Sequence, residues 1–263
     1  MTGRISLTTT HHEAGPVATV TVDNPAKANT LNTPLMHDFI ETFATLSNDK
    51  DLRAVILTGA GPRTFMGGAD IREMATLDGP EAARAFITRL HRCCAAVRDC
   101  PVPVIARIQG PCFGAGLELV ASCDLRLAAD TARFAMPEVR LGIPSVIEAA
   151  LLPGQVGWGR TRHMLYLAEP FTAAQAERWG LIEQSVPVQD LDTTLAAWLK
   201  SLLASPPGAI RAQKALMRKW EHLPIHDAIQ AGIEAFAAAY ATNEPRQAMA
   251  NFTAPAAPAR FAR

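Results

Sequence analysis

The sequence predicts an α/β fold, because short buried strands alternate along the chain with helices. Two strand–glycine loop–helix units follow each other within about sixty residues, with the short connections that compact domains favour. The apolar strand RAVILT precedes the loop FMGGAD, and a strand over 101–108 precedes the loop Gly114-Ala115-Gly116. Such alternation is typical of α/β proteins. A chain of 263 residues fits one large domain, or one domain with a modest appendage.

The N-terminal part predicts a strand pair, a loop and a helix. Residues 4–9 and 17–23 alternate and are rich in threonine and valine, which is typical of two paired strands. The loop 25–32, PAKANTLN, then leads to a helix with Thr33 as its N-cap and Pro34 as its first residue. The apolar run within RAVILT indicates a strand that is buried on both faces.

A long helix is expected over about residues 80–98, because Phe86, Leu90, Cys94 and Val97 form an apolar stripe at helical spacing. The elements predicted after it are a strand over 101–108, a short helix from the loop 114–116, a strand over 125–128, helices over 144–152 and 160–167, a helix between a Thr172–Gln175 capping box and Gly180, and a strand over 181–186.

From about residue 191 onward the pattern predicts only helices. They cover 193–204, 206–220 with Ser205 as the cap, and 225–241. We therefore expect an α/β core over 1–192 and a helical C-terminal region over 193–263. The Pro/Ala-rich tail APAAPARFAR is expected to be frayed or held only by a partner.

Composition excludes several classes of protein and site. Lys+Arg and Asp+Glu both number 25, which argues against a general nucleic-acid or anionic-membrane partner. Five cysteines without a CxxC pair are expected to be free, buried thiols in a reducing compartment. Without a signal peptide or an apolar membrane span, the expected location is the cytoplasm. The histidines lack metal-ligand spacing, so no metal is expected, and His91 and His163 are expected to be solvated helix residues.

The stretch from Ile108 to Glu138 carries the chemistry. Its glycine pair lets a ligand approach the backbone closely, and the helix that starts there offers free N–H groups to a negative charge. Glu118 lies in the first turn of that helix, and Glu138 follows Pro137. Two acids beside such a helix are suited to proton transfer next to an oxyanion. A dinucleotide fingerprint is excluded, because Leu119 stands where it needs a glycine.

Together the segments FMGGADI, IQGPCFGAGLELVASCD and FAMPEVRLGIP resemble the crotonase (enoyl-CoA hydratase/isomerase) family, and the likeness covers nearly the whole chain. The resemblance implies a spiral of ββα units followed by a helical trimerisation region over 193–263. It also implies trimers or dimers of trimers. The implied substrate is an acyl-CoA thioester, so coenzyme A is part of the substrate and no separate cofactor is expected.

The resemblance also implies a role for individual residues. The two oxyanion-hole N–H groups fall on Ala69 and Ala115, and the paired hydratase carboxylates fall on Glu118 and Glu138. By this resemblance Glu118 activates water for attack at C3 of the substrate, and Glu138 protonates C2. The residues implied in coenzyme A binding are Lys27 and Arg72 at the phosphates and Ala28, Asp70 and Ile71 around the adenine.

One segment departs from the family. SVIEA, residues 145–149, stands where the family usually has a glycine-rich run that shapes the acyl pocket and places the water. Ser145, Val146 and Glu148 are therefore expected to line the acyl pocket or to position water. The predicted activity is syn addition of water to a 2-enoyl-CoA. The alternatives are an enoyl-CoA isomerase that relies on Glu138, a CoA-ester hydrolase, and a non-catalytic acyl-CoA-binding oligomer.

Overall fold

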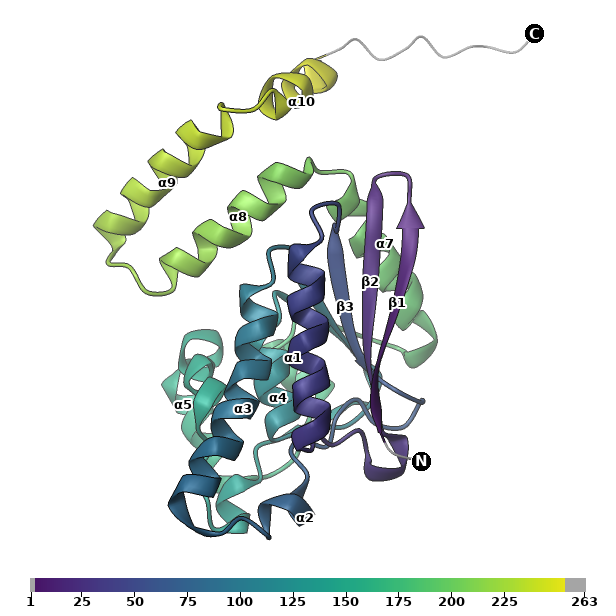
Figure 1. Ribbon diagram of the computed structural model, residues 1–263, viewed down its shortest axis with the longest axis vertical. Coiled ribbons are helices and arrows are strands. Elements are labelled where there is room, and N and C mark those ends of the chain that lie inside the picture. Colours follow the sequence, from purple (N-terminus) through teal and green to yellow (C-terminus); the bar gives the residue numbers. More distant parts are fainter. Residues whose placement is uncertain (1–2, 254–263) are drawn as a thin grey trace, which may run out of the picture. The chain divides into compact units, whose positions relative to one another are not determined.

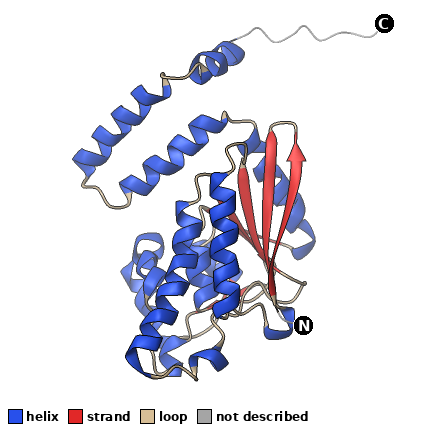
Figure 2. Ribbon diagram, in the orientation of Figure 1, coloured by secondary structure: helices blue, strands red, loops and turns tan. Residues whose placement is uncertain are grey.

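A six-stranded sheet organises the larger part of the chain. The computed structural model describes residues 3–253 and divides into two compact units, with the boundary between Leu202 and Leu203. Figure 1 shows the strands and helices along the chain, and Figure 2 colours them by type. The boundary lies ten residues beyond the expected one, because the helix that crosses position 193 buries leucines in the first unit.

The main sheet has the strand order β1-β2-β3-β4-β6-β9. The predicted N-terminal pair is present as an antiparallel hairpin, whereas every later neighbour is parallel. The strands are β1 (Arg4–His12), β2 (Gly15–Asp23), β3 (Ala54–Gly59), β4 (Val104–Ile108), β6 (Leu125–Ala129) and β9 (Gln184–Val186). All residues of β3 are buried, as its apolar run predicts.

A smaller sheet holds the loops that follow β3 and β4. It has the order β5-β7-β8, formed by Cys112–Phe113, Arg133–Ala135 and Phe171–Thr172. The helices of the first unit are α1 (Thr33–Asn48), α2 (Ile71–Met74), α3 (Gly79–Asp99), α4 (Ala115–Ser122), α5 (Leu152–Leu167), α6 (Ala173–Trp179) and α7 (Leu191–Leu203). Four 3-10 turns connect them: η1 (Pro25–Lys27), η2 (Glu138–Leu141), η3 (Ile147–Leu151) and η4 (Val188–Asp190). Helices α1 and α3 pack against each other, and α3 also packs against α4.

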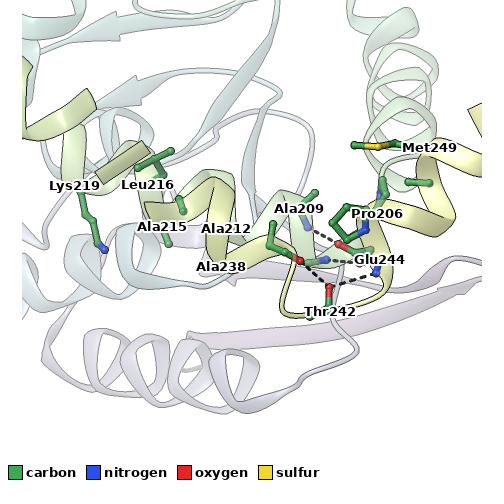
Figure 3. A pocket seen from close by; sticks show the side chains of 15 residues that line it. Pro206, Ala209, Ala212, Ala215, Leu216, Lys219, Ala238, Thr242, Glu244 and Met249 are labelled. Carbon is green, nitrogen blue, oxygen red and sulfur yellow. Dashed lines mark hydrogen bonds between the residues drawn. The ribbon is translucent and has the colours of Figure 1, made fainter. Parts of the chain in front are cut away.

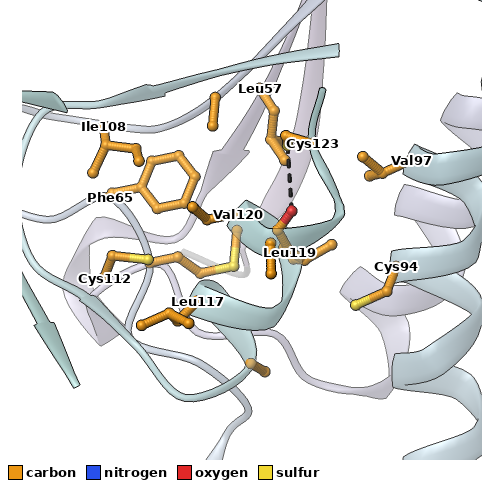
Figure 4. Close-up of a cluster of buried hydrophobic side chains, with 14 of the residues drawn as sticks. Leu57, Phe65, Cys94, Val97, Ile108, Cys112, Leu117, Leu119, Val120 and Cys123 are labelled. Atoms are coloured by element: carbon orange, nitrogen blue, oxygen red, sulfur yellow. Dashed lines mark hydrogen bonds between the residues drawn. The ribbon is translucent and has the colours of Figure 1, made fainter. Parts of the chain in front are cut away.

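Helix α4 lies inside the core. All eight of its residues are buried, as expected for a helix that is apolar on every side. Figure 4 shows its leucine and valine side chains among those of β3, β4 and α3. The five cysteines are free and buried, as predicted. Burial raises the pKa of the Cys93 thiol to about 12, and it raises the pKa values of Cys94 and Cys112 well above the ordinary value.

Three local predictions were wrong. Asn32 rather than Thr33 caps α1, since the Asn32 side chain accepts a hydrogen bond from the N–H of Leu35. The expected helix over 144–152 is instead the 3-10 turn η3 followed by α5, and α5 continues through a kink at Gly157, where φ is 79°. Pro206, not Ser205, precedes α8. The predicted Thr172–Gln175 capping box and the C-cap at Gly180 are confirmed.

The second unit contains α8 (Pro207–Trp220), α9 (Ile225–Ala239) and α10 (Glu244–Thr253). A cavity between them is lined by alanines more often than by any other residue type, and Figure 3 shows several of them. Glu244 accepts hydrogen bonds from the N–H groups of Gly208 and Ala209 at the start of α8. That carboxylate therefore stabilises a helix N-terminus and is engaged in structure. The prediction for the tail 254–263 lies outside the described residues.

Over residues 3–253, no helix combines the length and the apolar composition that crossing a bilayer requires.

Candidate active site

The two glycine-rich loops pack backbone against backbone. The N–H of Phe113 donates to the carbonyl of Met66 at 2.9 Å, and the N–H of Phe65 donates to the carbonyl of Pro111 at 3.0 Å. At Gly68, where φ is 96°, a Cβ atom would lie 3.3 Å from the amide nitrogen of Ala115. Only glycine fits this approach without strain. The residue after Gly68 is Ala69, so this approach brings the backbone just before Ala69 close to the N–H of Ala115.

Neither of these amides is used by the fold. Ala115 is the first residue of α4, where an N–H has no partner within the helix. Throughout the described part of the chain, no carbonyl or side chain accepts a hydrogen bond from the N–H of Ala69 or Ala115. Both residues line a cavity of about 750 Å³. The site therefore has two backbone donors available for a negatively charged oxygen.

Two buried amide side chains hold the first loop in place. The Asn29 side chain donates to the carbonyls of Ala60, Thr64 and Phe65, and the Asn29 backbone has a φ of 55°. Asparagine tolerates this left-handed conformation better than most residues do. From the other side, Gln109 donates to the carbonyl of Thr64 and to two carbonyls of the preceding turn. The position of Ala69 thus depends on side chains from two distant segments.

Replacing Asn29 with alanine should lower the free energy of unfolding by more than about 3 kcal/mol, because the carbonyls of Ala60 and Phe65 lose this donor and the buried N–H of Asn24 loses its acceptor, at roughly 1–3 kcal/mol each. The measurement is urea denaturation. Asn48→Ala is the matched control, since that exposed side chain donates only to the carbonyl of Ala44 on the surface of α1. Equal midpoints for the two variants would contradict this account of the loop.

Two acids reach the same cavity. The Glu118 side chain enters from the first turn of α4 and is 4% exposed. Glu138 is the first residue of η2, and it reaches the cavity because the N–H of Gly114 pairs with the carbonyl of Ala135 at the end of β7. A Cβ atom at Gly114 would lie 2.7 Å from Oε1 of Glu138. The second acid therefore lies directly over the glycine that precedes Ala115.

The Glu118 carboxyl holds its proton tightly. Burial, the charge of Glu138 and the smaller effect of the Glu148 charge together raise its pKa to about 8, against a lowering by the N–H of Ala149. Two carboxyl groups that interact this closely lose their protons as a pair rather than independently. At neutral pH the Glu118 carboxyl therefore retains its proton in the cavity that Glu138 also lines.

The three residues singled out in segment 145–149 do not lie in the same place relative to the cavity. Val146 lines the cavity. The Ser145 hydroxyl donates to Oε2 of Glu138 at 2.8 Å, so it orients that acid. Glu148 is 3% exposed and is not among the residues that line the cavity. Its Oε1 instead lies 2.9 Å from Nδ1 of His91 on α3. His91 is exposed on α3, as expected of a solvated helix residue, and it also contacts this buried carboxylate.

The residues predicted to bind coenzyme A are only partly gathered at the cavity. Ile71 lines it and is exposed. Lys27 pairs with Asp70 at 3.2 Å. Burial acts to raise the pKa of the Asp70 carboxyl, but the hydrogen bond from Lys27 and those from backbone N–H groups lower it overall. Ala28 lies beside the cavity, since its carbonyl accepts from the N–H of Gly67. Arg72 is exposed and is not among the lining residues. Arg84 of α3, which the sequence did not single out, does line the cavity.

One group of possible metal ligands occurs elsewhere. Within residues 3–253, ligand atoms of His37, Asp38 and Glu41 lie within 4.8 Å of one another. All three are exposed on α1, and none lines the cavity. The sequence analysis missed this grouping, which follows from helical spacing on one face. Exposed groups of this kind occur commonly on helix surfaces, so the grouping is not part of the site.

An α/β protein with two free backbone amides and two acids in one cavity has the groups of an enzyme that stabilises an enolate. The sequence profile of the enoyl-CoA hydratase/isomerase family matches residues 12–258. The chain therefore belongs to the enoyl-CoA hydratase/isomerase family, and the predicted family and fold are confirmed.

Relatives agree with this assignment. The short-chain-enoyl-CoA hydratase of Clostridium acetobutylicum is 32% identical over 239 residues, which is 90% of this chain and 91% of that protein. The crotonyl-CoA hydratase of Syntrophomonas wolfei is 30% identical over 90% of this chain and 91% of its own length. The structure of an enoyl-CoA hydratase from Bacillus anthracis superposes with a TM-score of 0.88 at 27% identity, covering 94% of this chain and 95% of that one.

Proposed function

We propose that this protein is an enoyl-CoA hydratase, a hydro-lyase that adds water across the double bond of a 2-enoyl-CoA thioester. The observation that carries the proposal is the convergence of Ala69, Ala115, Glu118 and Glu138 on one cavity. The names of relatives at 30–32% identity support the same activity.

The four groups divide the work. The amides of Ala69 and Ala115 polarise the thioester carbonyl and stabilise the enolate as charge reaches its oxygen. Glu118, which holds a proton in the free protein, first passes it to Glu138 and then takes a proton from the water that attacks C3. Glu138, oriented by the Ser145 hydroxyl, delivers a proton to C2. This chemistry requires one ionised and one protonated carboxyl, and a coupled pair that retains one proton at neutral pH supplies both.

The cavity also suits the hydrocarbon part of such a substrate. Its wall includes the apolar side chains of Met74, Leu77, Phe86, Ile87 and Leu90. Lys27 and Arg72 remain the proposed contacts for the coenzyme A phosphates, and Arg84 joins them because it lies at the cavity. Ala28, Asp70 and Ile71 remain the proposed surroundings of the adenine. No further cofactor enters this reaction.

The test is a panel of 2-enoyl-CoA thioesters of different chain length, followed by the loss of the conjugated-thioester absorbance. Hydration of at least one of them is the expected result. The second candidate, an isomerase that needs only Glu138, is favoured if a 3-enoyl-CoA is converted to its 2-enoyl isomer while no 2-enoyl-CoA is hydrated. Release of free coenzyme A from an acyl-CoA would favour a hydrolase. Binding of acyl-CoA without turnover would indicate a non-catalytic protein.

The pH profile of kcat/KM should be bell-shaped, with the alkaline limb near pH 8. Below the pKa of about 8 for Glu118, the acid pair keeps the proton that C2 requires. As the pH rises through that value the last proton leaves, and hydration should decline about tenfold per pH unit. Steady-state rates between pH 5 and 9.5 provide the measurement. A constant kcat/KM across the alkaline range would contradict the assignment of the pair.

We also propose that the helices of the second unit mediate assembly into a trimer or a dimer of trimers. Helix α9 exposes Ile225, Ile229, Ile233 and Phe236 along one face, and exposed apolar faces of this kind mark interaction sites. Analytical ultracentrifugation distinguishes these assemblies from a monomer. The proposed location of the protein is the cytoplasm, which cell fractionation tests.

A further inference from the structure

The two oxygens of the Glu138 carboxyl have different surroundings. The Ser145 hydroxyl donates to Oε2 at 2.8 Å. Within residues 3–253 this is the one hydrogen bond of the Ser145 side chain, and Oε1 of Glu138 accepts none. Oε1 instead lies over Gly114, where a Cβ atom would come within 2.7 Å of it. One oxygen is therefore held by the protein, while the other lies free beside the glycine that precedes Ala115.

The backbone after Glu138 returns the chain to this carboxyl. Segment η2 ends at Gly142, whose φ of 78° is a left-handed conformation that glycine adopts without strain. The N–H of Ile143 then donates to the carbonyl of Glu138 at 3.2 Å. This closed turn brings Ser145 beside Glu138, although seven positions separate them. The hydroxyl is thus held by the fold itself, as a preorganised site requires.

Ser145 does not line the cavity. The residues on either side of it, Pro144 and Val146, do line it. Val146 has an extended backbone, with φ of −133° and ψ of −157°, and successive side chains of an extended chain point to opposite sides. The Ser145 hydroxyl is accordingly directed at Glu138. Any effect of this hydroxyl on the reaction passes through that acid.

We propose that Ser145 is a positioning residue that makes Oε1 the oxygen of Glu138 from which the proton reaches C2. A proton on Oε2 would take the place of the serine proton and leave the hydroxyl hydrogen without an acceptor. The proton that Glu138 carries therefore resides on Oε1, the free oxygen.

The transfer then proceeds with the carboxyl held in one orientation. The O–H bond at Oε1 breaks, and a C–H bond forms at C2 from the electron pair of the enolate. The electron pair of the broken O–H bond stays on the carboxylate. Ser145 keeps its hydrogen bond to Oε2 throughout, and a hydrogen bond to an ionised oxygen is stronger than one to a neutral oxygen. The hydroxyl thus also stabilises the charge that the departing proton leaves behind.

The inference rests on the proposed function in making Glu138 the group that exchanges a proton with C2, but its test does not require hydration. A saturated acyl-CoA, butyryl-CoA, is incubated with the protein in D₂O. Replacement of hydrogen by deuterium at C2 is followed by NMR at saturating butyryl-CoA, and a separate titration gives the Kd of the same compound. Circular dichroism and thermal denaturation check the folding of each variant.

Ser145→Ala should slow exchange at C2 by roughly 10- to 100-fold, the loss that misplacement of a reacting group causes. The Kd for butyryl-CoA should remain that of the wild type, because Ser145 does not line the cavity. Ser145→Thr keeps the hydroxyl and should recover most of the rate. Ser185→Ala is the matched control, since the Ser185 hydroxyl also donates to a glutamate carboxylate, that of Glu177, at an exposed site outside the cavity. It should leave exchange unchanged.

Three results would overturn the proposal: wild-type exchange in Ser145→Ala, equal losses in Ser145→Ala and Ser145→Thr, or a wild type that exchanges no hydrogen at C2. A loss in Ser145→Ala that a weaker Kd fully explains would do the same. If Ser145→Ala does not fold, Ser145→Gly removes the same hydroxyl and should show the same loss.

The two proposals fail separately. A protein whose exchange at C2 depends on Ser145, but which hydrates no 2-enoyl-CoA, would refute the proposed function and leave this inference intact. A hydratase whose exchange does not depend on Ser145 would do the reverse.

Discussion

Glu118→Gln should lower kcat for hydration by roughly 10²- to 10⁴-fold, the range that general acid–base catalysis contributes. Glutamine keeps the size of the side chain and fits the buried position on α4, but it neither takes a proton from water nor shares one with Glu138. Substrate binding should change far less than kcat, because the cavity wall and the two amides are untouched. Stopped-flow measurement of the absorbance change, together with a binding titration of acyl-CoA, separates the two effects.

Glu41→Gln is the control for this variant, as Glu41 is exposed on α1 and should be replaceable without loss. The two candidate reactions give different outcomes. A hydratase loses its activity, whereas an isomerase that relies on Glu138 alone retains most of its turnover of a 3-enoyl-CoA. Full hydration activity in Glu118→Gln would remove Glu118 from the mechanism.

Ala115→Pro should reduce kcat by about 10²- to 10³-fold, the loss that follows removal of one oxyanion donor. Proline has no N–H, yet it is favoured at the first position of a helix, which is the place of Ala115 in α4. The change therefore removes the donor from a position where the fold does not use it. Circular dichroism and thermal denaturation check that the variant folds, and steady-state kinetics measures the loss.

Ala115→Gly provides the matched comparison, because glycine keeps the amide and removes only a methyl group. We expect it to stay within a few-fold of the wild type. If the proline variant folds and retains full activity, the Ala115 amide does not act on the substrate. If the glycine variant loses as much activity as the proline variant, the methyl group rather than the N–H is what matters.

Local signals predicted much of the fold, whereas the four cavity residues were assigned by the family resemblance. Neighbouring residues encode glycine loops, helix starts and apolar strands. The two strand–loop–helix units could therefore be predicted from the sequence. The pairing of His91 with Glu148 joins residues 57 positions apart, and nothing near either residue indicates it. Ile147 likewise has a φ of 40°, a left-handed conformation that a β-branched side chain disfavours. Tertiary packing therefore decides both features.

The start of α1 also shows that tertiary contacts affect what the sequence cannot predict, here the identity of the N-cap residue. Asn32 and Thr33 are both good N-cap residues, and the sequence does not choose between them. In the structure the N–H of Thr33, the first residue of α1, donates to the carboxylate of Glu73, while Asn32 caps the helix. A contact with a residue 40 positions away thus accompanies a choice that looks local.

Because all five thiols are buried, the folded chain should not react with electrophiles. The reactive form of cysteine is the thiolate. The core shields all five sulfur atoms and disfavours ionisation of Cys93, Cys94 and Cys112. A thiol-directed reagent would consequently tag only molecules that have opened. The rate of labelling would then report the rate at which the folded chain opens. The sequence therefore already contains a probe of local unfolding.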